Sequence, residues 1–237
     1  SKVSLRKWML ACYFVVEMKR GVSSLQLSKI VGVTQKTAWF MLQRIHNCFS
    51  IEIKEPCLKG EIEVDETYIG GKNKNRHSKD KVKDAQGRSL KDKTPVFGTL
   101  QREGFVVAYV VTDTKGKTLL PLIYNTVHPN STIYSDARYA YNGINKEKFD
   151  HQKVYHKKGA YVIGRRSTNT IEGYWSHLKK MISGTHFWVS RKHLQRYVDC
   201  ESFRYNTKHL SESERFDVFL QNTKRRLRYS QIKKITA

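Results

Sequence analysis

GEIEVDETYIGG, residues 60–71, is the stretch of this 237-residue sequence that decides the fold. Its side chains alternate in character, with Ile62 and Val64 on one side of the backbone and Glu63 and Asp65 on the other. A period of two residues is that of a β-strand, and the double glycine at the end of the stretch terminates the strand. The sequence therefore predicts a strand that carries a carboxylate, Asp65, near its centre.

The sequence after this strand predicts a mixture of strands and helices. Residues 72–93 are almost entirely polar, which is typical of a mobile loop. The later predicted elements are a hairpin over 94–113 that turns at Arg102, Glu103 and Gly104, a helix over 117–127 with Pro121 in its first turn or at a kink, a strand over 131–136, a turn or short helix over 137–144, a strand over 150–158, and helices over 168–182 and 190–206. This alternation predicts an α/β domain.

The segment before the strand predicts a group of short helices. Apolar side chains recur at helical spacing over residues 5–20 and again over residues 23–45, where Gly32 separates two helices. The first turn of the second of these helices exposes three polar residues, Gln35, Lys36 and Thr37. This is the layout of a helix-turn-helix, whose recognition helix contacts DNA bases with its N-terminal residues. A small helical bundle without DNA contacts shows the same turn, so both interpretations stay open.

The charge of the chain predicts a polyanionic partner. Lys and Arg number 44 against 21 Asp and Glu, a formal net charge of +23, which is more than solubility requires. No apolar run reaches the roughly 18 residues of a membrane span, and residues 1–20 lack the cleavage-like site of a signal peptide. The four cysteines form no C-x-x-C pair and so indicate neither a disulfide framework nor a zinc ribbon. We expect a soluble, intracellular protein without a membrane partner.

Three carboxylates occupy unusual places in this pattern. Asp65 lies within a strand with apolar flanks, Asp136 ends a predicted strand, and Glu172 is the one acidic residue in the basic run 151–196. Taken singly, Asp65 is explained as well by a salt-bridged strand residue as by a metal ligand, while Asp136 is better explained as a turn or capping aspartate and Glu172 as a carboxylate favoured by a helix N-terminus. Taken together, they can form a hard-oxygen site for Mg²⁺ or Mn²⁺ that acts on phosphodiesters. Their order, on a strand, a second strand and a helix, is that of a ribonuclease H-like fold.

Three motifs now resemble a known family. VDETYIGG around Asp65, YSDARYAYNGI around Asp136 and NTIEGYWSHLKK around Glu172 are similar to those of bacterial and archaeal insertion-sequence DDE transposases with an ISXO-type transposase domain. The resemblance covers residues 5–210. It implies an α/β, ribonuclease H-like catalytic core behind an N-terminal all-α helix-turn-helix region, dependence on Mg²⁺ or Mn²⁺, with two ions, and cleavage and strand transfer at DNA ends.

The resemblance also implies roles for particular residues. Asp65 and Asp136 would be metal ligands, and the third position would be Glu172 or, as in part of this group, an asparagine, here Asn169. A downstream lysine of the signature corresponds to Lys179, which shares a helix face with Asn169 and Glu172. Further DNA-binding candidates in the basic run are Lys180, Arg165 and Arg166, although such charges can equally be solvated.

These inferences predict three regions: a helix-turn-helix DNA-binding region over 1–58, a ribonuclease H-like transposase domain over 59–210 and a basic tail over 211–237. The predicted partners are double-stranded DNA, both transposon ends and target, and further copies of the chain in a homodimer or larger assembly on DNA. The resemblance implies a cytoplasmic, nucleoid-associated protein of a prokaryote. Two alternatives remain, a nuclease or resolvase of the same fold and a domesticated DNA-binding protein without catalysis. The zinc ribbon common in this group is missing, so it was either lost or cut off.

Overall fold

A computed structural model describes residues 2–50, 57–71, 77–83, 89–154, 167–223 and 227–234. The chain divides into two compact units, of which one comprises Ser1–Ile51 together with Leu178–Ala237 and the other comprises Glu52–His177. We call them the helical unit and the sheet unit. No helix in the described ranges is long and apolar enough to cross a membrane.

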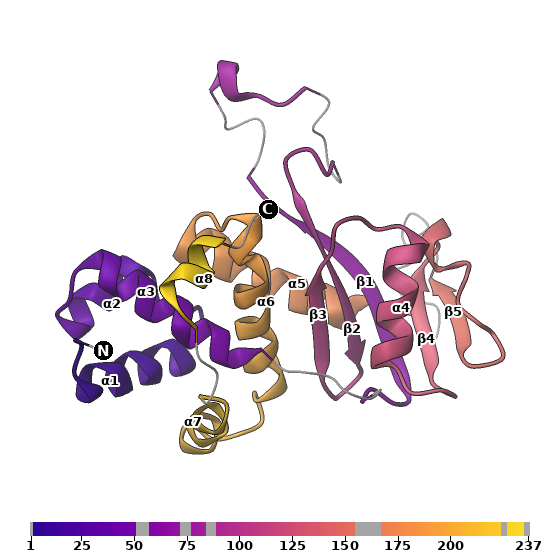
Figure 1. Cartoon of the computed structure of the whole chain (residues 1–237). Coiled ribbons are helices and arrows are strands. Elements are labelled where there is room, and N and C mark those ends of the chain that lie inside the picture. Colours follow the sequence, from indigo (N-terminus) through magenta and orange to yellow (C-terminus); the bar gives the residue numbers. More distant parts are fainter. Residues whose placement is uncertain are drawn as a thin grey trace. The chain divides into compact units, whose positions relative to one another are not determined.

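The sheet unit contains a five-stranded mixed sheet (Figure 1). The strands are β1 (Glu61–Ile69), β2 (Thr94–Gln101), β3 (Val106–Val110), β4 (Thr132–Asp136) and β5 (Asp150–Val154). Their order is β3-β2-β1-β4-β5, with β1, β2 and β3 antiparallel and with β4 and β5 parallel to β1. This is the strand order of a ribonuclease H-like fold and confirms the predicted α/β class.

The two faces of β1 differ as its alternation predicts. Ile62 and Val64 are fully buried and belong to a hydrophobic cluster with residues of α4 (Gly116–Thr126). On the other face, Glu63 and Asp65 hydrogen-bond residues of α5 (Asn169–Met181). Charged groups are therefore held between the sheet and α5, while the apolar side chains of β1 face α4.

The connections of the sheet unit follow the sequence prediction with two differences. The β2–β3 hairpin turns where expected, with Glu103 at φ 58°. Pro121 lies inside α4 rather than in its first turn. Proline has no backbone N–H to donate, and because Pro121 is exposed, the backbone group left without that donor lies on the solvent side of the helix. In the described part of the polar stretch 72–93, Ser78–Asp80 form a 3₁₀ turn, and residues 72–76 and 84–88 lie outside the described ranges. Beyond β5, the predicted strand residues 155–158 lie outside them too.

The helical unit begins with three helices at the predicted positions, α1 (Leu5–Glu17), α2 (Ser24–Val31) and α3 (Gln35–His46). A capping box between Ser23 and Gln26 starts α2, and Gly32 ends it in the left-handed conformation at φ 65°. The Thr34 side chain then accepts a hydrogen bond from the Thr37 backbone and starts α3. Local sequence signals therefore account for both ends of the turn between α2 and α3.

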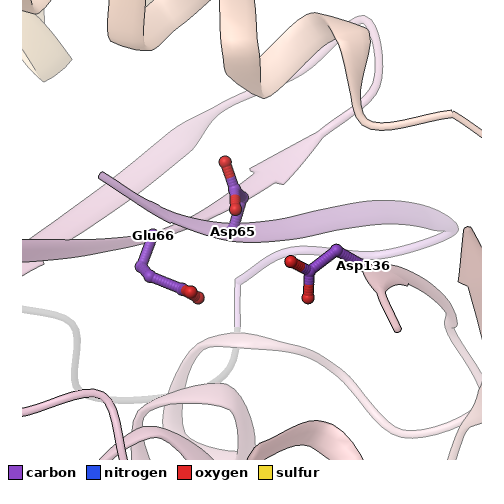
Figure 2. Close-up of side chains that lie close together, drawn as sticks. All are labelled: Asp65, Glu66 and Asp136. Atoms are coloured by element: carbon purple, nitrogen blue, oxygen red, sulfur yellow. The ribbon is translucent and has the colours of Figure 1, made fainter. Parts of the chain in front are cut away.

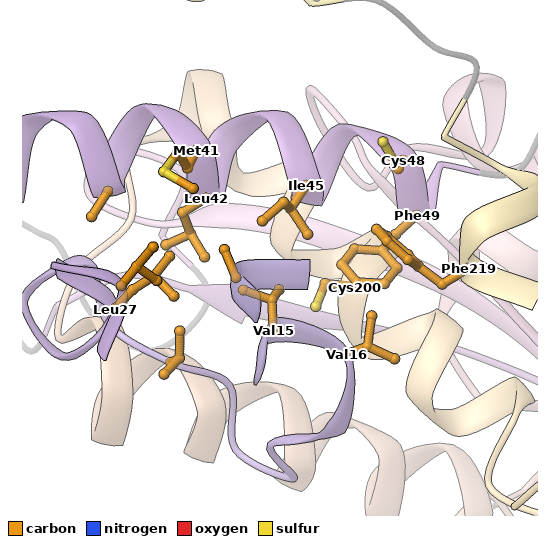
Figure 3. Close-up of a cluster of buried hydrophobic side chains, with 14 of the residues drawn as sticks. Val15, Val16, Leu27, Met41, Leu42, Ile45, Cys48, Phe49, Cys200 and Phe219 are labelled. Carbon is orange, nitrogen blue, oxygen red and sulfur yellow. The ribbon is translucent and has the colours of Figure 1, made fainter. Parts of the chain in front are cut away.

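The C-terminal part of the chain completes the core of this unit. It contains α6 (Arg191–Asn206), α7 (Glu212–Gln221) and α8 (Tyr229–Lys234). Cys200, Phe203 and Phe219 are buried in the same cluster as Val15 and Phe49 of the N-terminal region (Figure 3). The helical unit therefore combines N-terminal and C-terminal residues, and the predicted functional division at residues 58 and 210 stays a prediction. The segment expected as a basic tail, 211–237, contains α7 and α8, and Phe219 of α7 is buried in this core.

Histidines lie in the interior of the helical unit. His46 is buried, with its ring centroid 4.6 Å from that of Tyr197, and His186 packs on the same tyrosine at 4.7 Å. Burial lowers the pKa of His46 well below its ordinary value, and burial together with Arg204 lowers the pKa of His186 to about 4. Both imidazoles are therefore neutral in the folded protein near neutral pH.

We expect acid to destabilise the protein through these histidines. As pH falls below about 6.5, the unfolded chain binds protons that the folded protein does not, so the free energy of unfolding falls. His186 alone should account for roughly 2 kcal/mol between pH 7 and pH 5. Urea unfolding of wild type and of His186→Gln, each at pH 7 and at pH 5, measures this loss of unfolding free energy. The control variant His209→Gln, which removes an exposed histidine, should show the same pH dependence of stability as wild type. If His186→Gln also showed the wild-type dependence, the assignment of this effect to His186 would be contradicted.

Candidate active site

Two predicted carboxylates meet in the sheet. Strands β1 and β4 are parallel, and their last paired residues are Val64 and Ser135, so Asp65 and Asp136 follow side by side. Asp65, Asp136 and Glu66 each present a carboxylate oxygen, and these oxygens lie within 4.8 Å of one another (Figure 2). The two aspartates are half-buried and Glu66 is buried. Clustered carboxylate oxygens are the donors that Mg²⁺ and Mn²⁺ prefer.

Both aspartates are oriented by hydrogen bonds. The indole Nε1 of Trp175, on α5, donates to Asp65 Oδ2 at 3.0 Å. The backbone N–H of Arg138 donates to Asp136 Oδ1 at 3.1 Å. Side chains that are fixed in this way need little reorganisation to bind a ligand.

Gly98 allows Trp175 to reach Asp65. This glycine pairs with Asp65 across β1 and β2, and a Cβ atom at its position would lie 2.7 Å from Trp175 Cη2. Any larger residue would push the indole away from the sheet. The glycine is therefore required for the close packing of α5 beside the carboxylates.

Glu66 is a site residue that the sequence prediction missed. Its carboxylate forms an ion pair with Arg138 and accepts a hydrogen bond from the Tyr141 hydroxyl. Burial and the nearby carboxylates Asp65 and Asp136 raise the pKa of Tyr141, so the tyrosine remains a neutral donor. Glu66 thereby ties β1 to the segment that follows β4. The sequence does contain one signal for Glu66, because this carboxylate falls on the side of β1 that is otherwise apolar.

The start of α5 is fixed to the sheet by a buried carboxylate, Glu63. Its Oε2 accepts from the backbone N–H of Ile171 at 2.9 Å, and its Oε1 accepts from Thr170 Oγ1 at 3.1 Å. Arg102 Nε donates to the same Oε1 at 2.8 Å, while Arg102 Nη2 donates to the carbonyl of Ser167 at 2.9 Å. A negative charge at a helix N-terminus is electrostatically favourable. This network sets the position of the helix that carries the predicted third site residue.

The remaining predicted metal-site residues lie on α5. Asn169 and Glu172 are exposed, and Glu172 Oε1 accepts a hydrogen bond from Thr168 Oγ1 at 3.3 Å. Among the described residues, the group of three carboxylates contains Glu66 and not Glu172. The place of Glu172 or Asn169 at the metal therefore stays a prediction.

The predicted DNA-binding residues are placed as follows. Lys179 and Lys180 are exposed in the last turn of α5, and Gln35 and Lys36 are exposed in the first turn of α3. Thr37 is half-buried and hydrogen-bonds Thr34. Arg165 and Arg166 lie outside the described residues.

The fold and the site together define a ribonuclease H-like protein, with Asp65 in the central strand and Asp136 at the end of its parallel neighbour. Residues 57–206 match the ISXO2-like transposase domain, and the chain belongs to this family. The predicted resemblance to insertion-sequence transposases is thereby confirmed.

Two relatives have descriptions that agree with this family. An uncharacterized protein in transposable element ISH50 of Halobacterium salinarum is 29% identical over 210 residues, covering 84% of this chain and 68% of the relative. An uncharacterized transposase-like protein of Haemophilus influenzae is 27% identical over 97 residues, covering 40% of this chain and 77% of the relative.

Similar solved structures include two complexes of Mos1. The Mos1 strand transfer complex has a TM-score of 0.36 at 10% identity, covering 94% of this chain and 75% of the other. A pre-cleavage Mos1 transpososome has a TM-score of 0.27 at 8% identity, covering 92% and 79%.

Proposed function

We propose that this protein is a DDE transposase that cleaves DNA at the ends of an insertion sequence and joins those ends to target DNA. The observation that carries the proposal is the meeting of Asp65 and Asp136 in adjacent parallel strands of a ribonuclease H-like sheet. Membership of a transposase family supports the choice of DNA as the substrate. The net charge of +23 suits a polyanion of this kind.

The residues present fit divalent ions. Carboxylate oxygens of Asp65 and Asp136 lie within 4.8 Å of each other, with Glu66 equally near, and such oxygens are the hard donors that Mg²⁺ and Mn²⁺ take. When bound, two such ions activate the attacking water or hydroxyl and stabilise the leaving oxygen of a phosphodiester. In this proposal Asp65 and Asp136 hold the ions, and Glu66 holds β1 in place.

DNA would be bound by separate groups of basic and polar residues. Gln35 and Lys36, at the exposed start of α3, would contact bases of the transposon end. Lys179 and Lys180, together with Arg165 and Arg166, would contact phosphates. An assembly of two or more copies on two DNA ends, in the cytoplasm of a prokaryote, completes the proposal.

A strand-transfer assay tests the function. The purified chain is incubated with pre-nicked terminal-repeat DNA, supercoiled plasmid and Mn²⁺, and the products are mapped. We expect joined molecules. Hydrolysis without joining would favour a nuclease, and DNA binding without either product would favour a domesticated DNA-binding protein. In parallel, Ca²⁺ should preserve the complex and stop the reaction, because its coordination is looser than that of Mg²⁺.

Trp175→Phe isolates the hydrogen bond to Asp65. The variant keeps an aromatic ring beside Gly98 but loses the Nε1–H donor. We expect the Mn²⁺ concentration for half-maximal cleavage to rise about 10- to 100-fold, the usual effect of removing a partner of a metal ligand. Trp8→Phe, in the helical unit, is the chemically matched control and should behave as wild type. An unchanged Mn²⁺ requirement in Trp175→Phe would show that this bond does not prepare the site.

Single variants decide between the two candidates for the third position. If Glu172 binds metal, Glu172→Gln should be nearly inactive with Mg²⁺, because an amide cannot balance the charge of the ions, and Asn169→Ala should be milder. We expect this order, since Glu172 is the one carboxylate in the basic run 151–196. Lys179→Ala should slow turnover in either case. Cleavage rates over a Mn²⁺ titration measure the order, and a larger loss in Asn169→Ala would reverse the assignment.

A further inference from the structure

Two large aromatic side chains are exposed between α5 and α6. Phe187 is 83% exposed and Trp188 is 68% exposed. They follow a π-helical segment, Ile182–His186, that continues directly from α5. Short π-helical segments occur frequently at functional sites. We call Phe187 and Trp188 the aromatic tip.

The backbone of the aromatic tip is strained. Phe187 has φ 59° and ψ −47°, a conformation that side-chain-bearing residues rarely adopt. The Trp188 N–H donates to the His186 carbonyl at 2.6 Å, which closes a three-residue γ-turn of the rare, positive-φ kind. Strain of this sort persists only where the surroundings enforce it, and it concentrates at functional positions.

The surroundings of the aromatic tip do enforce the turn. The His186 ring packs against Tyr197 at 4.7 Å and His46 at 6.1 Å between centroids. The Thr185 hydroxyl donates to the carbonyl of Arg20 at 2.8 Å. The residues immediately before the tip are thus anchored in the helical unit, while the rings of Phe187 and Trp188 remain exposed to solvent.

The charge around the aromatic tip indicates the chemistry of its partner. Between Lys179 and Lys192 the sequence contains four cationic residues, Lys179, Lys180, Arg191 and Lys192, and no carboxylate. All four are exposed. Exposed rings flanked by cations match a nucleic acid, in which the cations meet phosphates and the rings stack on bases. Bases inside a continuous duplex are already stacked on each other, so the available faces are those of unpaired bases.

We propose that Phe187 and Trp188 stack on unpaired bases of DNA and so favour DNA with an opened end over a closed duplex. The inference rests on DNA as the partner in the proposed function. It does not depend on the carboxylate site or on catalysis.

Binding of two fluorescent DNAs tests the aromatic tip. One is a flush duplex, and the other is the same duplex with a short single-stranded extension. Wild type should bind the extended DNA more tightly. Phe187→Ala and Trp188→Ala should each weaken binding of the extended DNA about 5- to 150-fold, the range for removal of one base-stacking ring, and leave the flush duplex nearly unchanged. Phe105→Ala, which removes a 53% exposed phenylalanine from a hairpin, is the matched control and should change neither.

Two further measurements separate stacking from other roles. The dependence of affinity on salt should be the same in wild type and Phe187→Ala, since the ring contacts no phosphate, whereas Lys180→Ala should reduce it. Phe187→Gly should unfold about 2–4 °C higher than Phe187→Ala, because glycine adopts positive φ without strain, yet both should lose binding equally. At most positions the glycine variant is less stable than the alanine variant, so the expected order of unfolding temperatures is the reverse of the usual one.

Several outcomes overturn the inference. Equal weakening on both DNAs, or no weakening on the extended DNA, would remove stacking as the role of the tip. A change of oligomeric state in the alanine variants would assign the tip to a contact between copies of the chain. If wild type binds neither DNA, the proposed partner itself is wrong, which distinguishes that failure from failure of the tip alone.

Discussion

Asp65→Asn and Asp136→Asn are each expected to abolish DNA cleavage and leave DNA affinity within several-fold of wild type. An amide keeps the size of the side chain but loses the negative charge that holds a divalent ion. Charge stabilisation by a bound ion lowers a barrier by several kcal/mol, so the rate should fall on the order of a thousand-fold. Affinity should survive because it comes mainly from lysines and arginines that contact phosphates.

Cleavage rates and binding constants, measured on the same terminal-repeat DNA with Mn²⁺ for cleavage and Ca²⁺ for binding, test this separation. Glu147→Gln is a suitable control, because Glu147 is an exposed carboxylate of the same unit and is not part of the cluster. It should cleave at the wild-type rate. Substantial cleavage by either aspartate variant would remove that residue from the site. Loss of binding together with cleavage would indicate that the substitution disturbs the fold.

Glu63→Ala should cost the protein about 3–5 kcal/mol of stability, the range measured when one partner of a buried ion pair is removed. Glu63 is fully buried, and its loss would leave Arg102 without its 2.8 Å partner and the Ile171 N–H without an acceptor. We expect a correspondingly lower midpoint of urea unfolding. The start of α5 should also exchange its amide hydrogens faster, because Glu63 joins it to β1.

Glu61→Gln is the matched control for this prediction. Glu61 lies on the same strand and pairs with the same arginine at 3.5 Å, but its side chain is 35% exposed. Exposed ion pairs contribute up to about 1 kcal/mol, so this substitution should cost far less. Similar losses for Glu61→Gln and Glu63→Ala would show that burial of Glu63 is not what makes its ion pair important.

The sheet and its two aspartates could be predicted because their signals are local. Alternating side chains around Asp65 indicate a strand, and Asp136 follows a short apolar run that ends there. Parallel pairing of β1 and β4 then brings the two carboxylates together. Glu66 was missed because its role depends on Arg138 and Tyr141, more than seventy residues away along the chain.

Features that depend on long-range packing could not be predicted in the same way. The local sequence of α7 shows a capping box, but only the tertiary structure shows that Phe219 is buried in a core begun by α1. The aromatic tip is a similar case. The amino-acid sequence around Phe187 does not by itself require a positive φ. The turn is enforced by the packing of His186 on Tyr197 and by the hydrogen bond from the Thr185 hydroxyl to the Arg20 carbonyl.

The division of the chain has a consequence for biosynthesis. The sheet unit is inserted between the two segments of the helical unit, so the ribosome releases α1, α2 and α3 before α6 and α7 exist. Ala11, Val15 and Phe49 therefore emerge without Cys200, Phe203 and Phe219, which complete their core. All residues of the sheet unit are present once residue 177 has emerged, whereas the core beside the turn at Gly32 is complete only after Phe219 has been made. A fragment of residues 1–58 would lack these C-terminal side chains, so its part of the core would stay incomplete.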